Sequence, residues 1–360
     1  MKLVIFGLSV SSSWGNGHAT LWRGLCRALA RRGHRVVFFE RDVPYYAENR
    51  DLTESPGLDL ILYPSWSDAL PLARQHLRDA EAGVVTSYCP DALRASALLL
   101  DSPARLRVFY DMDSPVTLDR LRRGEQVEYV GPRGYQDFDL VLSFAGGRTL
   151  QALRDELGAR RVSPLYGSVD PAIHHPVVPE ERFRADLSYL GTYAADRQPA
   201  FHQLLIQPAS RLPGRSFLVG GALYPDDFPW LPNISFLRHV APGEHPAFFS
   251  SSLVTLNVSR RPMAESGYCP SGRIFEAASC GVPVITDPWE GIDEFYEPGR
   301  EILVANRAED VIASLQLRPE ELTRIGARAR ERTLESHTAA HRVAAMESVF
   351  ESVLAPATPR

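Results

Sequence analysis

Residues 265–287 hold the side chains whose types and spacing most clearly indicate chemistry. A polar turn at 269–272 precedes a predicted helix in which Arg273 and Glu276 follow one turn apart. Free amide groups and the positive end of the helix dipole favour an anion at such an opening. Positions three and four apart share a helix face, so Gly272, Arg273 and Glu276 can contact one ligand.

The ligand that fits this pattern is a phosphate next to a ring with two vicinal hydroxyls. Amide groups from Ser271 onward and the guanidinium of Arg273 would bind the phosphate charge, and Glu276 would accept hydrogen bonds from the hydroxyls. A nucleotide-diphosphate sugar has this shape. In the alternative interpretation, the segment is an ordinary strand–helix–strand unit with an Arg273–Glu276 pair on its surface.

A second polar segment follows the first predicted strand, Leu3–Leu8, and ends at His18, where a helix is expected over 18–32. The helix dipole favours a neutral imidazole there, which can accept a proton from a hydroxyl group. In the alternative, His18 caps the helix or binds an acceptor without a chemical role. Five residues of the loop are further candidates for contacts with an acceptor: Ser13, Trp14, Gly15, Asn16 and Gly17.

Two carboxylates, Asp111 and Asp113, follow the predicted strand Leu106–Tyr110. Carboxyl ends of parallel strands line the ligand crevice of an open α/β sheet, so we expect both to reach it, Asp111 as a catalytic group and Asp113 near the acceptor. In the alternative, Asp113 caps the next helix and Asp111 binds loop amides. Asp-x-Asp spacing also occurs at metal sites, but we expect no metal here.

The second half of the chain offers further groups for a diphosphate. Gly191, at the end of a predicted strand, permits close backbone approach, Thr192 offers a hydroxyl, and Arg197 can pair with phosphate oxygens. The alternative pairs Arg197 with Asp196 at the surface. Arg260 follows another predicted strand and is expected to face the same ligand.

Composition limits the class of protein. The chain has 360 residues, of which 44% are hydrophobic and 23% charged, and this length suits two domains. A net charge of −5 argues against a nucleic-acid partner. No apolar run approaches the roughly 20 residues of a membrane span, no signal peptide precedes the first strand, and four cysteines lack metal-ligand spacing. We therefore expect a cytoplasmic protein, and frequent arginine and alanine hint at a bacterial source.

Near-continuous apolar strands alternate with amphipathic helices along the chain, which predicts parallel sheets covered on both faces. A proline-rich stretch without periodicity interrupts this alternation. The predicted organisation is an N-terminal Rossmann-like lobe, a linker, a C-terminal Rossmann-like lobe and a final helix, over 1–170, 171–185, 186–336 and 337–360.

Several motifs resemble those of CgeB-like (spore-maturation) glycosyltransferases, which have the GT-B fold. They are Asn257–Arg260, Gly267–Ser271, Arg273–Ala278 and the segment Gly191–Arg197. The resemblance implies an α/β fold of two Rossmann-like parallel-sheet lobes that face across a cleft, with a C-terminal helix that crosses back to the first lobe. Many retaining GT-B enzymes have a second glutamate where this chain has Tyr268, which leaves the stereochemical course open.

The resemblance also implies a function. A nucleotide-diphosphate sugar would bind the C-terminal lobe, with Val240 near the base and Arg260 near the diphosphate, and a small-molecule, glycan or natural-product acceptor would bind the N-terminal lobe. No metal and no cofactor beyond the donor substrate are expected, because arginines and helix dipoles neutralise the diphosphate. Two alternatives are a nucleotide-sugar epimerase or hydrolase on the same fold and a non-catalytic two-lobed sugar-binding protein.

Overall fold

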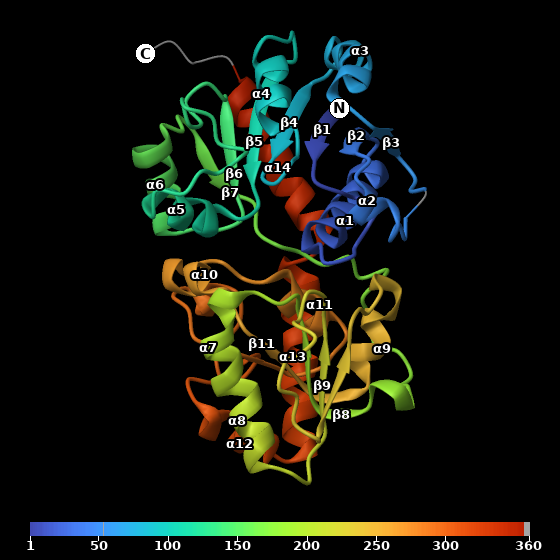
Figure 1. The fold of residues 1–360 in the computed structure, drawn as a ribbon, viewed down its shortest axis with the longest axis vertical. Helices are drawn as coiled ribbons and strands as arrows, with labels where there is room; N and C mark the ends of the chain where they lie inside the picture. Colours follow the sequence, from blue (N-terminus) through green and yellow to red (C-terminus); the bar gives the residue numbers. More distant parts are fainter. Residues whose placement is uncertain (53, 356–360) are drawn as a thin grey trace. The chain divides into compact units, whose positions relative to one another are not determined.

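The computed structural model describes residues 1–52 and 54–355, and its internal contacts divide the chain into two compact units (Figure 1). The N-terminal unit comprises residues 1–166 together with the segment from Ala339 onward. The C-terminal unit comprises residues 167–338. The expected linker, 171–185, thus belongs to the C-terminal unit.

The N-terminal unit is built on a sheet of seven parallel strands in the order β3-β2-β1-β4-β5-β6-β7. Helices cover both of its faces (Figure 1). The strands are β1 (Lys2–Gly7), β2 (Arg35–Arg41), β3 (Leu58–Tyr63), β4 (Ala82–Thr86), β5 (Leu106–Asp111), β6 (Leu140–Ser143) and β7 (Val162–Pro164). The helices are α1 (Gly17–Arg31), α2 (Pro44–Ala47), α3 (Trp66–Leu77), α4 (Ala92–Leu100), α5 (Ser114–Arg122), α6 (Arg148–Leu157) and α14 (Ala339–Leu354).

Alternate residues of the central strand β1 enter separate cores on the two faces of this sheet. Val4 and Phe6 belong to one buried cluster, whereas Leu3 and Ile5 belong to the other. All four are at most 1% exposed, which accounts for the continuous apolar run in the sequence.

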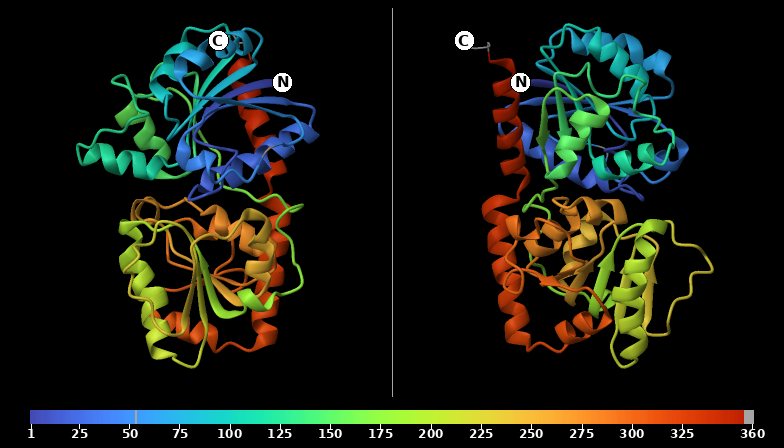
Figure 2. Two further views of the ribbon diagram at one scale, coloured as in Figure 1. Left: turned by 45° about the vertical axis from the view of Figure 1, so that its right-hand side comes forward. Right: turned by 90° about the vertical axis from the view of Figure 1, so that its left-hand side faces the viewer.

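The last helix, α14, packs on α1 and β5 of the N-terminal unit (Figure 2). Val343, Met346 and Phe350 recur at helical spacing and are buried in the same cluster as Leu3 and Ile5. This burial explains why α14 belongs to the N-terminal unit, whereas the preceding helix, α13, belongs to the C-terminal unit. The C-terminal helix was expected in this place.

The C-terminal unit has six parallel strands in the order β10-β9-β8-β11-β12-β13. They are β8 (Ala185–Leu190), β9 (Phe217–Gly220), β10 (Ile234–Leu237), β11 (Ser252–Asn257), β12 (Val284–Thr286) and β13 (Leu303–Val304). The helices are α7 (Gln198–Phe201), α8 (Gln207–Arg211), α9 (His245–Ser250), α10 (Arg261–Ser266), α11 (Gly272–Ser279), α12 (Ala308–Leu315) and α13 (Pro319–Ser336).

One strand is shorter than its apolar run predicts. A strand is expected over 282–287, but β12 covers only Val284–Thr286. Pro283 has no N–H group to donate to a neighbouring strand, although its carbonyl accepts a hydrogen bond from Thr255 N at 3.0 Å. The predicted start of the strand was wrong because proline can accept hydrogen bonds from a neighbouring strand but cannot donate one.

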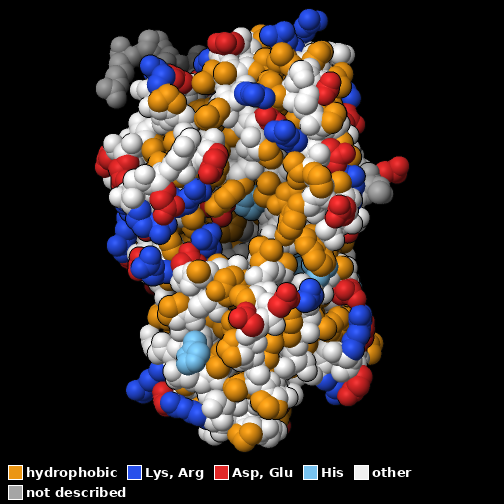
Figure 3. Space-filling model, viewed as in Figure 1, with side chains coloured by type: hydrophobic (Ala, Val, Ile, Leu, Met, Phe, Trp, Pro, Cys, Tyr) orange, Lys and Arg blue, Asp and Glu red, His pale blue; other side chains and the backbone are white. Residues whose placement is uncertain are grey.

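Surface properties agree with the composition. Acidic and basic side chains are both spread over the face of each unit shown in Figure 3. Within the described residues, no helix combines the length and apolar character needed to cross a membrane. All four cysteines are buried and free.

Candidate functional site

Glu40, at the end of β2, organises the loop that precedes α1. Its fully buried carboxylate accepts hydrogen bonds from the backbone N–H groups of Val10 and Ser11, at 2.7 and 2.9 Å. The hydroxyls of Ser9 and Ser11 also donate to it. The carboxylate is thus fully occupied with the loop, a role that the sequence did not indicate.

The loop candidates Ser13 to Gly17 form a fixed entry to α1. The hydroxyl of Ser13 donates to Asp51, and Gly15 has a φ of 60°, which favours glycine. Asn16 is the N-cap: its side-chain oxygen accepts from His18 N at 3.1 Å, and its amide donates to two loop carbonyls. Trp14 is partly buried, and a Cβ at Gly17 would meet no atom within 4 Å. His18 therefore lies in the first turn and does not cap the helix.

His18 and Asp113 form a pair at the carboxyl ends of the strands. His18 Nε2 lies 2.8 Å from Asp113 Oδ2, and the Ser87 hydroxyl donates to the same oxygen at 3.3 Å. His18 Nδ1 is buried and has no hydrogen-bond partner among the described residues. Because carboxylates only accept, Nε2 carries a proton, and Nδ1 is the nitrogen that remains for contact with another group. Asp113 occupies the N-cap position of α5, but its side chain binds His18 and not the helix amides.

Asp111 lies beneath this pair and is fully buried. Its carboxyl accepts hydrogen bonds from Asp113 N, from the Thr117 hydroxyl and from the Tyr135 hydroxyl, each at 3.0 Å. The expectation that Asp111 lines the crevice as a catalytic group is corrected, since no part of the side chain is exposed. Its contacts instead fix the backbone that carries Asp113.

Asp111 should make the stability of the protein depend on pH. Burial, followed by the charge of Asp113, raises its pKa from 3.8 to about 7. Between these values the folded chain binds a proton that the unfolded chain lacks, so the free energy of unfolding falls as pH rises from about 4 through 7. Asp111→Asn should remove this decrease. In urea titrations, the free energy of unfolding of the variant relative to that of the native protein should rise by on the order of 2 kcal/mol between pH 5 and pH 8.

Asp139 provides the control for this measurement. Its pKa is lowered despite burial by hydrogen bonds from Arg107, whose guanidinium lies 2.8 Å away. Asp139→Asn should lose stability at neutral pH. If both variants gained the same relative stability between pH 5 and pH 8, Asp111 would not be the source of the pH dependence.

The helix α11 forms as the sequence predicts, with Ser271 at its N-cap. The Ser271 hydroxyl oxygen accepts from Arg273 N at 3.3 Å, and a Cβ at Gly272 would meet no atom within 4 Å. Arg273 and Glu276 are paired through Nη1 and Oε2. This is not the surface pair of the alternative interpretation, because Glu276 is 4% exposed, whereas the side chain of Arg273 is 28% exposed.

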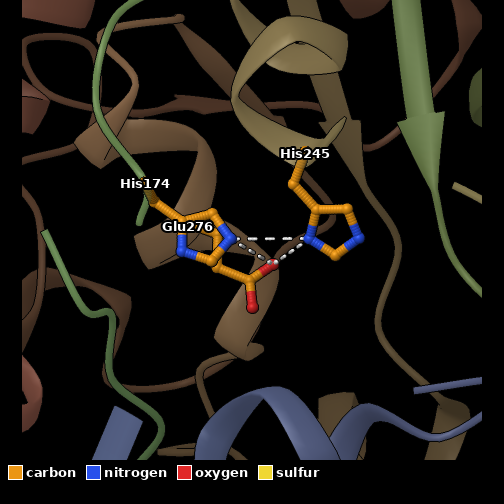
Figure 4. A group of neighbouring side chains, drawn as sticks. All are labelled: His174, His245 and Glu276. Carbon is orange, nitrogen blue, oxygen red and sulfur yellow. Dashed lines mark hydrogen bonds and ion pairs between the residues drawn. The ribbon is translucent and has the colours of Figure 1, made fainter. Parts of the chain in front are cut away.

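Two histidines that the sequence did not single out complete the surroundings of Glu276 (Figure 4). His245 Nδ1 and His174 Nε2 lie 3.6 and 4.0 Å from Glu276 Oε2. Burial alone would raise the pKa of Glu276, but Arg273 and the two histidines hold it well below its usual value. The carboxylate is therefore ionised at neutral pH.

The residues expected to bind a diphosphate make local contacts in the C-terminal unit. Gly191 packs closely over Tyr189, whose hydroxyl would lie 2.5 Å from a Cβ at Gly191. Arg197 donates to the carbonyl of Thr192 at 2.7 Å.

Asp196 pairs with Arg260 through two guanidinium nitrogens, at 3.1 and 2.9 Å, and not with Arg197 as the alternative held. The structure brings Asp196 and Arg260 together across 64 residues. Val240 is buried, and its carbonyl accepts from His245 Nε2 at 3.2 Å.

Each unit has a tyrosine with a left-handed backbone conformation next to its candidate residues. Tyr88, with a φ of 59°, packs against His18 in a T-shaped arrangement, with ring centroids 6.1 Å apart. Tyr268, with a φ of 47°, precedes α11, and its ring packs against Gly291. Positive φ in a bulky residue is strained and is found most often at functional sites.

Comparison with known proteins locates the chain among glycosyltransferase-like folds. Residues 197–348 match a family model described as glycosyl transferase-like. The search of curated proteins finds no match.

Solved structures are similar over nearly the whole chain. Sucrose-phosphate synthase from Thermosynechococcus elongatus has a TM-score of 0.71 and 14% identity, over 98% of this chain and 99% of that one. Anabaena HepE in complex with UDP and glucose has a TM-score of 0.69 and 12% identity, over 98% and 100%. A mutant of T4 phage BGT in complex with UDP-glucose has a TM-score of 0.60 and 10% identity, over 99% and 100%. The predicted GT-B fold class is confirmed.

Proposed function

We propose that this protein is a metal-independent glycosyltransferase that transfers a sugar from a nucleotide-diphosphate sugar to an acceptor hydroxyl. The observation that carries the proposal is the combination at α11 of an N-terminal opening, an adjacent half-buried guanidinium and an ionised carboxylate. Arg273 and the amides at Ser271 and Gly272 would bind the diphosphate, and Glu276 would bind the ribose.

In this proposal, the His18–Asp113 pair acts on the acceptor. His18 Nδ1 takes the proton of the acceptor hydroxyl, whose oxygen forms a bond to the anomeric carbon while the bond from that carbon to the diphosphate oxygen breaks. The nucleoside diphosphate leaves with the bonding electrons. Asp113 stabilises the imidazolium that forms, and Arg197, Arg260 and Arg273 meet the charge of the leaving group.

The proposal extends to the donor nucleotide and to the cellular compartment. HepE is solved in complex with UDP and glucose, and the T4 phage BGT mutant with UDP-glucose, which makes UDP-sugars the first donors to test. The CgeB-like motifs of the sequence favour that branch of the fold. Free buried thiols suit a reducing compartment, and we place the enzyme in the cytoplasm.

The test is release of nucleoside diphosphate from a panel of UDP-, GDP- and ADP-sugars, with and without a mixture of sugar and phenol acceptors. We expect release that depends on an acceptor and persists in EDTA. Fast release without acceptor would favour the hydrolase or epimerase, and binding without product would favour a sugar-binding protein. Loss of activity in EDTA, restored by Mn²⁺ or Mg²⁺, would overturn metal independence.

A further inference from the structure

Two buried histidines enclose the same oxygen of Glu276 that Arg273 binds (Figure 4). His174 and His245 are each 2% exposed, and their rings face each other with Nε2 and Nδ1 3.4 Å apart. They come from different parts of the unit: His245 begins α9, whereas His174 belongs to the segment before β8.

Hydrogen bonds fix the ring of His245 and the backbone of His174. His245 Nε2 lies 3.2 Å from the carbonyl of Val240, which can only accept, so Nε2 carries the proton. The carbonyl of His174 accepts from the Ser279 hydroxyl at 2.6 Å, one turn beyond Glu276 on α11. Burial lowers the pKa of His245, and it lowers that of His174 to about 4. In the neutral pair, His245 Nδ1 bears a lone pair and accepts from His174 Nε2.

The three side chains also have the spacing of a metal site, with ligand atoms within 4.8 Å of one another. A cation there would have to share Glu276 Oε2 with the guanidinium of Arg273, which already hydrogen-bonds that oxygen. Two positive charges at one oxygen repel each other. The guanidinium therefore occupies the role that a metal would have, and the histidines need another explanation.

The contacts leave the two oxygens of Glu276 unequal. The contacts with Arg273, His174 and His245 all use Oε2. Oε1 is turned away from both rings (Figure 4) and accepts no hydrogen bond from the described residues. A carboxylate held by one oxygen presents the other in a fixed direction.

We propose that His245 and His174 are positioning residues: His245 Nδ1 accepts from His174 Nε2 and so keeps that N–H group beside Glu276 Oε2, which directs Oε1 toward the vicinal hydroxyls of the donor ribose. The hydrogen bond from His245 to the carbonyl of Val240 also connects the surroundings of Glu276 with the loop expected at the nucleotide base. This inference rests on the proposed function, and it adds two residues that act on the donor only through Glu276.

The test compares the dissociation constants of UDP and 2′-deoxy-UDP by calorimetry. The native protein should prefer UDP by about 10-fold or more, the effect of one hydrogen bond to a charged group. His245→Phe keeps the ring and removes both nitrogens, and His174→Phe does the same behind it. Both variants should bring the preference toward unity. If His245→Phe does not fold, His245→Gln keeps a donor for Val240 and removes Nδ1.

His337 provides a matched control in the same unit. It is 6% exposed, and its Nε2 lies 3.2 Å from the carbonyl of Phe295. His337→Phe should lose stability and keep the preference for UDP, because a purely structural change weakens both ligands equally.

Three results separate the failures. An unchanged preference in His245→Phe and His174→Phe overturns this inference while the proposed function stands. A preference that survives Glu276→Gln removes the ribose assignment itself, and this inference with it. One equivalent of zinc in the purified protein, measured by mass spectrometry, would also overturn it, because the cluster would then be a metal site.

Discussion

Glu276→Gln should reduce the affinity for UDP by about 100-fold or more, while the protein remains folded. A carboxylate that binds two ribose hydroxyls makes two charge-assisted hydrogen bonds, each worth about 1.5–3 kcal/mol. The neutral amide loses this charge and presents a donor to the guanidinium of Arg273. The measurement is calorimetric titration with UDP, supported by the shift in melting temperature on binding.

Glutamine is the informative replacement because of where the structure places the side chain. In the alternative interpretation of the sequence, Glu276 and Arg273 form a pair on the surface, where alanine would be harmless to the fold. The side chain is instead 4% exposed and paired with Arg273. Alanine would leave a partly buried charge without its partner, at a cost of about 3 kcal/mol, and would confuse lost binding with lost folding.

Glu301 is the matched control for this prediction. It lies in the same unit, its side chain is 13% exposed, and it pairs with Arg332 at 3.2 Å. Glu301→Gln should bind UDP as the native protein does. Native affinity in Glu276→Gln would remove the ribose role and with it the observation that carries the proposed function.

The backbone of the donor helix could be predicted because its signals are local. Ser271 at the cap, the three-residue spacing of Arg273 and Glu276, and Gly281 beyond the end lie within a few residues of one another. Short-range hydrogen bonds and side-chain spacing on one helix face determine such a feature, and both can be read from sequence.

The surroundings of Glu276 could not be predicted in the same way. His174 and His245 precede it by about a hundred and about thirty positions, respectively, and meet it only through the packing of the unit. Arg260 and Asp196 show the same limit: the sequence offered Arg197 as the neighbour of Asp196, and tertiary structure selected Arg260. Partner choice among charged residues depends on the fold and not on sequence distance.

The sequence also could not predict which carboxylate of the N-terminal unit is buried. Asp111 and Asp113 are two positions apart and have the same chemistry, but one is fully buried and the other pairs with His18. Strand alternation does not separate them, because residues two positions apart share a face; the strand ends at Asp111, and the chain turns before Asp113, at the N-cap of α5, so the two carboxylates have different surroundings. The sequence predicted both carboxylates at the crevice, with Asp111 as a catalytic group, whereas the structure pairs His18 with Asp113.

His18→Ala should lower turnover by about 10²–10⁴-fold without changing the dissociation constant of the donor. The imidazole is held by Asp113 through Nε2, and its remaining nitrogen, Nδ1, has no hydrogen-bond partner among the described residues. A proton taken from the acceptor can go only to that nitrogen. Asp113→Asn should also lower turnover, because it removes the charge that stabilises the imidazolium. Donor binding, measured separately, should remain native, since α11 lies in the other unit.

The second histidine–carboxylate pair of the N-terminal unit is the control for His18. His34 pairs with Glu347 through Nε2, and its Nδ1 lies 2.8 Å from the amino group of Met1. His34→Gln should loosen α14 and lower the melting temperature with little effect on turnover per folded molecule. If His18→Ala turned over at the native rate, His18 would not be the base, and its pair with Asp113 would serve only to order the loop. If turnover and stability fell together in both His34→Gln and His18→Ala, the loss of turnover would have a structural cause. If His18→Ala lost turnover without losing stability, the cause would be the missing base.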